Sequence, residues 1–288
     1  MSLKRSDFRY SERLRVRWAE VDAQKIVFNG HYLMYFDTAL AGYWRALALP
    51  YMETMEYLGG DVYLRKASLE YAASAHYDDV LEIGMRSLRI GNSSLLFAAA
   101  ALRGEQILVQ GELVYVFADP ATQTSKPVPH ELRELLAAFE AGKSIVEVRV
   151  GAWAELGADA KRIRDAVFVQ EQHIAAEREW DDADAACLHG VAYNRFGMAL
   201  ATGRLLEHVP GVAKIGRLSV VRAMRGSGIG RTLLDALMRA GRDRGYREAV
   251  LHAQTSAARF YRRAGFVERG PQFDEVGIPH VEMVRALP

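Results

Sequence analysis

The chain has 288 residues, of which 50% are hydrophobic and 25% charged, and its formal net charge is +1. This composition is typical of a globular protein with room for about two domains, and the near-neutral charge argues against a nucleic-acid partner. The single cysteine excludes a disulfide within the chain, and no apolar run is long enough to span a bilayer. We therefore predict a cytoplasmic protein without a membrane segment and, since cysteine and histidine show no paired ligand spacing, without a metal.

The first half of the chain reads as an antiparallel sheet with one long helix. A strand is predicted from Tyr10 to Trp18, and a largely apolar helix starts near Tyr32 and ends at Pro50. Turn residues separate the strand-like runs that follow, at residues 63–73, 80–90, 94–103 and 106–118. Because the helix is apolar on much of its surface, we expect the sheet to curve round it.

The segment between the first strand and the helix carries a family signature. Residues 21–32, VDAQKIVFNGHY, resemble the signature of the hotdog-fold acyl-CoA thioesterases related to 4-hydroxybenzoyl-CoA thioesterase, and residues 90–95 resemble a later turn of that family. The resemblance covers about residues 8–125. It implies that Asp22 is the catalytic carboxylate, as nucleophile or general base, and that the backbone N–H of Asn29 polarises the thioester carbonyl. Apart from the resemblance, Asp22 reads as a turn or capping residue.

One position departs from this family. Glycine is frequent in the family where this chain has Lys25, and a side chain there would alter the turn, narrow the pocket or pair with Asp22. This departure leaves open an inactive first domain that serves only as a scaffold for oligomers. His31 is interpreted as a helix-start residue without a chemical role.

A polar, proline-bearing break at residues 122–129 separates the two halves, and a helix is predicted from His130 to Ala141. This helix either closes the first domain or bridges to the second. The predicted organisation is a hotdog domain at residues 1–128, a linker helix at 129–143 and a second domain at 144–288.

The second half alternates strands and helices in an order that predicts one α/β domain. A helix is expected from Ala158 to Gln170, followed by an acidic loop from Arg178 to Asp184. We interpret the charges of this loop as solvated, and the alternative is a rim that attracts an amine. Strands are predicted at residues 145–150, 187–193, 198–206, 213–221 and 248–254, then a helix at 255–264 and final strands.

A glycine-rich turn follows the strand that ends near Val221. Glycines let the backbone approach a ligand, and the helix that starts after the turn favours a diphosphate. The turn is neither a Walker loop nor a dinucleotide fingerprint, and by itself it fits a phosphate site or a simple strand-to-helix turn equally well. The residues expected at the diphosphate are Arg225, Gly226, Ser227, Gly228, Ile229, Gly230 and Arg231.

The Arg-x-x-Gly-x-Gly spacing of this turn resembles the acetyl-CoA loop of the GNAT N-acetyltransferases. Residues 257–266, 167–172 and 277–283 resemble further segments of that family, so the resemblance covers about residues 144–288. It implies acetyl-CoA as cosubstrate, with its pantetheine arm on the backbone of Leu218, Ser219 and Val220.

The same resemblance suggests residues for the chemistry. Tyr261 is the candidate acid that protonates the departing thiolate, and the alternative is a packing role beside Phe260. Glu171 is the candidate base on its position at the end of the first helix, not on the resemblance, and the alternatives are a cap or an ion pair with a neighbouring arginine. Gln254 stands where the family often has asparagine.

The predicted fold class is α+β, with an N-terminal hotdog domain and a C-terminal GNAT domain with a mixed sheet. We expect a bifunctional enzyme that hydrolyses an acyl-CoA and acetylates an unidentified amine, and that forms a homodimer or higher homo-oligomer through the hotdog domain. Two alternatives remain: an acetyltransferase with an inactive hotdog scaffold, and a sensor that binds coenzyme A without turnover.

Overall fold

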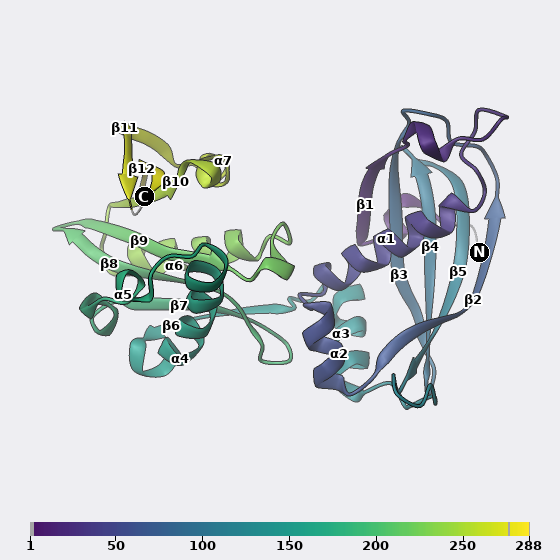
Figure 1. Ribbon diagram of the computed structural model, residues 1–288, viewed down its shortest axis with the longest axis horizontal. Helices are drawn as coiled ribbons and strands as arrows, with labels where there is room; N and C mark the ends of the chain where they lie inside the picture. The colour runs from purple at the N-terminus through teal and green to yellow at the C-terminus, as the bar shows by residue number, and fades with distance from the viewer. Residues whose placement is uncertain (1–2, 276, 288) are drawn as a thin grey trace. The chain divides into compact units, whose positions relative to one another are not determined.

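The computed structural model describes residues 3–275 and 277–287, and it divides into two compact units, Met1–Ile145 and Val146–Pro288 (Figure 1). The outer ends of the predicted domains, residues 1 and 288, lie outside the described residues. Each unit contains its own sheet.

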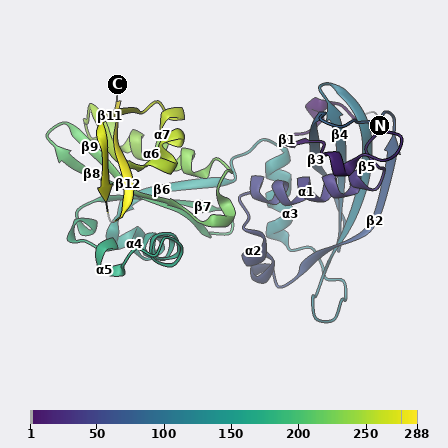
Figure 2. The same cartoon turned by 45° about the horizontal axis from the view of Figure 1, so that its top comes forward.

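The first unit is one antiparallel sheet with the order β1-β3-β4-β5-β2. Helix α1 (His31–Ala46) crosses one face of this sheet, as Figures 1 and 2 show. Tyr43 of the helix packs edge-on against Phe97 of β4, with ring centroids 5.7 Å apart, and both side chains are fully buried. The strands and the shorter helix are β1 (Tyr10–Arg15), α2 (Tyr51–Leu58), β2 (Asp61–Tyr71), β3 (Val80–Ile90), β4 (Ser94–Arg103) and β5 (Gln106–Ala118).

Helix α3 (His130–Glu140) packs on the first unit. Phe139 meets Tyr43 edge-on at 5.4 Å, and the carboxylate of Glu140 accepts hydrogen bonds from the hydroxyl of Tyr43 and from the backbone N–H of Ser87. The leucines of the helix are buried against the same core. Of the two roles predicted for this helix, closure of the first unit is the one these contacts support.

The second unit is a mixed sheet with the order β11-β12-β10-β9-β8-β7-β6. Among the described residues, β9 and β10 are its one parallel pair. Together the two sheets confirm the predicted α+β class. The strands are β6 (Val146–Ala152), β7 (Leu188–Asn194), β8 (Ala199–Val209), β9 (Val212–Val220), β10 (Glu248–Gln254), β11 (Val267–Glu275) and β12 (Ile278–Ala286). The helices are α4 (Trp153–Arg164), α5 (Ala176–Glu179), α6 (Ile229–Asp243) and α7 (Ala258–Arg263).

The first helix of this unit differs from the prediction. It begins at Trp153 rather than Ala158, and it continues beyond Arg164 as a π-helical segment from Asp165 to Glu171. The early start is explained by packing, since Leu156 is buried in the core and Trp153 lies against it. Both residues continue the helical spacing of Ile163 and Val167 toward the N-terminus, on the other side of Gly157.

None of the helices in the described part of the chain is both long and apolar enough to cross a membrane.

Candidate functional site

The loop between β1 and α1 closes on itself like a small hairpin. Val21 forms an antiparallel bridge with Val27, and the N–H of Asp22 donates to the carbonyl of Ile26 at 2.9 Å. The N–H of Lys25 donates in turn to the carbonyl of Asp22 at 2.9 Å. Backbone hydrogen bonds therefore fix the loop, with Asp22 half-buried at its start.

The carboxylate of Asp22 has both a structural contact and a free oxygen. Its Oδ1 accepts a hydrogen bond from the N–H of Gln24 at 2.8 Å, which makes an Asx turn. Within residues 3–275 and 277–287, its Oδ2 has no partner. Lys25 is exposed and makes no ion pair with Asp22 in this part of the chain. One oxygen is thus available for chemistry while the other holds the turn.

Lys25 has φ = 63°, a left-handed conformation that costs an L-residue about 1–2 kcal/mol. Replacing Lys25 with glycine should therefore raise the free energy of unfolding of the first unit by about 1 kcal/mol. Calorimetric scans of the full chain would measure this. Lys25→Ala, which keeps the Cβ atom, is the matched control and should leave the transition unchanged. Equal stabilisation by alanine would contradict the backbone explanation.

The start of α1 supplies hydrogen-bond donors next to this loop. In the described residues, the backbone N–H groups of Asn29 and Gly30 have no acceptor. The carbonyl of Asn29 accepts a hydrogen bond from the hydroxyl of Tyr71 at 3.2 Å, which ties the helix start to the end of β2. The N-terminus of a helix favours negative charge. The same loop thus supplies the carboxylate of Asp22 and, at its end, backbone N–H groups without an acceptor.

Glu20 fixes the loop against α1, a role that the sequence did not indicate. Its side chain is buried and accepts hydrogen bonds from the hydroxyl of Tyr35 and from the N–H of Arg17, both at 2.7 Å. Burial alone would raise the pKa of Glu20, but the bonds from Arg17 and Tyr35 outweigh it and lower the pKa. The N–H of Phe28 donates to the Glu20 carbonyl at 2.9 Å. A charged residue beside a predicted turn carries no signal of such burial.

In the second unit, β9 and β10 separate after a short parallel ladder. Their pairing covers residues 212–214 and 248–250. Arg217 then takes a left-handed conformation, φ = 51°, where the register of β9 against β8 shifts. Beyond this bulge Ser219 and Val220 pair with β8 on one side, and in the described part of the chain residues 218–220 pair with no strand on the side of β10. The buried hydroxyl of Ser219 has no hydrogen-bond partner there either.

The predicted glycine loop follows directly and ends at α6. Gly226 and Gly228 have φ = 80° and 89°, conformations that L side chains rarely adopt, and a Cβ atom at either would meet only open space. Among the described residues, the N–H groups of Gly226, Gly228, Ile229 and Gly230 have no acceptor. Four unused donors at the start of a 15-residue helix form a site suited to an anion.

Two predicted site residues meet in one ion pair. Arg225 donates to both carboxylate oxygens of Glu171, at 2.6 and 2.7 Å. The hydrogen bond from Arg225 lowers the pKa of Glu171. Arg231 pairs with Asp235 at 2.9 Å. This geometry favours the ion-pair alternative for Glu171, because a carboxylate with a lowered pKa is a weak proton acceptor at neutral pH.

Tyr261 lies on α7 in a largely apolar setting. Its ring packs edge-on against Phe260 and Phe266, with centroids 4.9 and 6.0 Å away, and burial raises its pKa to about 12. Within the described residues its hydroxyl has no hydrogen-bond partner. Packing thus orients the ring while the phenol keeps its proton at neutral pH.

The acidic segment before β7 is solvated only in part, because Asp181 and Asp182 are exposed whereas Glu179 and Asp184 are buried, and for these two the prediction was wrong. Arg164 of α4 is buried and donates to Glu179 at 2.6 Å and to Asp184 at 2.7 Å. Arg204 of β8 donates to Asp184 as well, at 2.7 Å, and the guanidinium of Arg164 lies 4.7 Å from the ring centroid of Trp180. Burial raises the pKa of Glu179 despite these cations. The cluster fixes α5 and the turn after it.

The described residues contain no cluster of three or more histidine, cysteine, aspartate or glutamate side chains placed to hold a metal.

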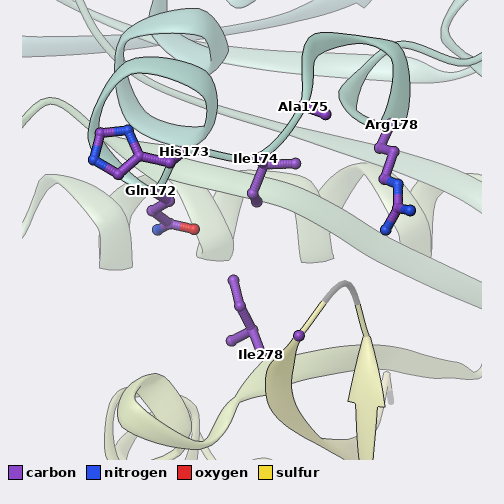
Figure 3. Close-up of a pocket in the computed structure, with 7 residues that line it drawn as sticks. Gln172, His173, Ile174, Ala175, Arg178 and Ile278 are labelled. Carbon is purple, nitrogen blue, oxygen red and sulfur yellow. The ribbon is translucent and has the colours of Figure 1, made fainter.

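A pocket lies beneath this fixed segment (Figure 3), and its volume is about 420 Å³. The pocket lining comes from the connection between the π-helical segment and α5, from α5 itself and from the start of β12 with the residue before it. It consists of Gln172, His173, Ile174, Ala175, Arg178, Gly277 and Ile278.

Comparison with known proteins divides the chain in the same way. The family model of the thioesterase-like superfamily matches residues 16–136, and that of the acetyltransferase (GNAT) domain matches residues 167–287. The second half is similar to the uncharacterized N-acetyltransferase YjcF of Bacillus subtilis (strain 168), with 34% identity over 128 residues, which is 44% of this chain and 90% of the relative.

Two further similarities fall on one half each. A protein of Aquifex aeolicus (strain VF5) that is provisionally named an esterase is 27% identical over 124 residues, 43% of this chain and 94% of its own. A crystal structure of a provisionally named N-acetyltransferase from Lactobacillus plantarum has 32% identity and a TM-score of 0.48, over 50% of this chain and all of that one.

Proposed function

The chain belongs to the thioesterase-like superfamily over its first half and to the GNAT acetyltransferases over its second, and on this premise we propose that it is a bifunctional enzyme of coenzyme A thioesters. The first unit hydrolyses an acyl-CoA, and the second transfers the acetyl group of acetyl-CoA to an amine. The observation that carries the proposal is that each unit has unused backbone N–H donors at a helix start, beside a group suited to the chemistry.

For hydrolysis, Asp22 and Asn29 have different roles. The free oxygen of Asp22 either takes a proton from water, which attacks the thioester carbon, or attacks that carbon itself to form an anhydride that water then opens. The N–H of Asn29 stabilises the developing oxyanion in either case. The C–S bond breaks, and the coenzyme A thiolate takes up a proton.

For acetyl transfer, the glycine loop holds the diphosphate. The pantetheine arm pairs with the free edge of β9 at Leu218, Ser219 and Val220. The amine attacks the acetyl carbon, the C–S bond breaks, and Tyr261 protonates the thiolate. A carboxylate tied to an arginine is a poor base, so Glu171 is assigned to positioning the loop through Arg225.

Exposed aromatic side chains near Asp22 support a homodimer through the first unit. Trp18 and Tyr77 contact each other edge-on at 5.3 Å and are 75% and 52% exposed, and Phe28 and Tyr71 are 51% and 53% exposed. Large apolar groups gathered on a surface mark a site of association. A second copy seated there would cover the loop and form the acyl pocket with it. The same surface fits the alternative that the first unit only drives oligomerisation.

The test is thiol release from a panel of acyl-CoAs of increasing chain length, first without an amine and then with one. Release without amine supports the thioesterase. Acetylated product formed only with amine supports the acetyltransferase. Coenzyme A binding by calorimetry without either reaction would instead identify a sensor, and transfer without hydrolysis would identify a scaffold in the first unit.

Tyr261→Phe separates acid catalysis from packing, because only the hydroxyl is removed. We expect kcat for acetyl transfer to fall about 100-fold while the KM for acetyl-CoA stays unchanged. Since burial raises the pKa of Tyr261 to about 12, the acid form persists through neutral pH and is lost only as the pH approaches that value. The wild-type rate should therefore show no loss from this group up to pH of about 10. An unchanged kcat in the variant would leave Tyr261 with a packing role alone.

A further inference from the structure

The pocket of Figure 3 has the size of a small-molecule site. Its volume of about 420 Å³ lies in the range of pockets that enclose a metabolite rather than a protein surface. Arg178 points into the space between α5 and the start of β12, and Ile278 points toward it from below in the same view.

The pocket adjoins the strand edge where the thioester is expected. Gln172 lines the pocket, and its side-chain oxygen accepts a hydrogen bond from the amide of Gln254 at 2.9 Å. Gln254 is the last residue of β10, at the end of that strand beyond its ladder with β9. A ligand in the pocket therefore has one end next to the gap in the ladder that would receive the pantetheine arm.

The charged groups of the pocket are of one sign. None of the seven lining residues carries a carboxylate, whereas Arg178 carries a positive charge. In the described part of the chain the guanidinium of Arg178 has no ion-pair partner. Two acidic residues flank Arg178 in sequence. Glu179 is paired with Arg164 and Arg217, and Glu177 is exposed and, among the described residues, makes no ion pair with Arg178.

The position of Arg178 is fixed although its guanidinium is free. Glu179, the next residue, is anchored in the buried cluster by Arg164, and Arg217 donates to the carbonyl of Glu179 at 3.2 Å. An arginine on a rigid backbone with unused donors is suited to bidentate recognition of a carboxylate or phosphate.

We propose that the acceptor of the second unit is a small amine that also carries an anionic group, bound by Arg178 with its amine directed toward Gln172. The inference rests on the proposed acetyl transfer and adds the chemical class of its acceptor. The amine nitrogen bonds to the acetyl carbon as the C–S bond breaks, and the nitrogen loses a proton while the thiolate gains one. The anionic group takes no part in the reaction and sets the orientation.

The experiment compares matched acceptors with the full-length protein and acetyl-CoA. Amino acids of increasing chain length from glycine upward are assayed against their carboxamides, and an aminoalkyl phosphate against the corresponding amino alcohol. We expect kcat/KM to favour the anionic member of each pair. Arg178→Gln should lower kcat/KM for the anionic acceptors about 10- to 100-fold, mainly through KM, and leave the neutral acceptors unchanged. The two series show whether carboxylate or phosphate is preferred.

Arg244→Gln, at an exposed arginine after α6, is the matched control and should change neither series. Faster transfer to neutral amines, or an equal effect of Arg178→Gln on both members of a pair, would overturn the acceptor assignment and leave the acetyltransferase standing. Absence of transfer to every amine, with coenzyme A still bound, would overturn the proposed transfer and this inference with it.

Discussion

Replacing Asp22 with asparagine should lower acyl-CoA hydrolysis by the first unit about 10²- to 10⁴-fold, while binding of the acyl-CoA persists. The substitution removes the negative charge but keeps an oxygen that accepts the hydrogen bond from Gln24. The Asx turn therefore survives, and the change is confined to the group that attacks or deprotonates. Thiol release measures the rate, and calorimetry with a non-hydrolysable acyl-CoA analogue measures binding.

A control variant and a control activity test whether the loss of hydrolysis is specific to Asp22. Glu105→Gln neutralises an exposed carboxylate in the turn between β4 and β5 and should leave hydrolysis unchanged. Acetyl transfer by the second unit should be the same in both variants and in the wild type. Full hydrolysis by Asp22→Asn would assign Asp22 to the turn alone, and the first unit would then need a different explanation.

Replacing Arg164 with methionine should lower the free energy of unfolding of the second unit by about 3–5 kcal/mol. The substitution removes the cation that the buried carboxylates of Glu179 and Asp184 share, so Glu179 keeps only Arg217 and Asp184 keeps only Arg204. Each buried carboxylate then has less compensating positive charge, and loss of one partner of a buried ion pair costs far more than the intact pair contributes. Calorimetric unfolding of the full chain gives the shift, and the emission of Trp180, which lies beside the guanidinium, reports the local change.

Arg162→Met provides the matched control on the same helix. Arg162 pairs with Asp159 at 2.8 Å, but its side chain is 65% exposed, so its loss should cost less than about 1 kcal/mol. Equal effects at the two positions would show that the buried cluster contributes no more than a surface pair. A large effect at Arg164 alone would establish that the cluster fixes the segment on which Arg178 stands.

The sequence by itself determined the features that depend on neighbours in the chain. Alternating and helical patterns predicted the two sheets and helix α1, because side-chain period follows directly from local backbone geometry. The glycine spacing predicted the loop before α6, since Gly226 and Gly228 take conformations that glycine alone adopts easily. The resemblance to the thioesterase family, rather than the local pattern, identified Lys25 as unusual in its turn, where φ is 63°.

The tertiary structure alone decided which charges are buried and which residues meet. Glu179 and Asp184 read as solvated in sequence, yet they lie beneath Arg164 and Arg204 of α4 and β8. Glu171 meets Arg225 across 54 residues of sequence. Local patterns carry no record of such pairs, because an ion pair depends on the packing of elements that are distant in the chain. Burial then changes the energy of the ion pair, since removal of water strengthens the attraction between the two charges and destabilises any charge without a partner.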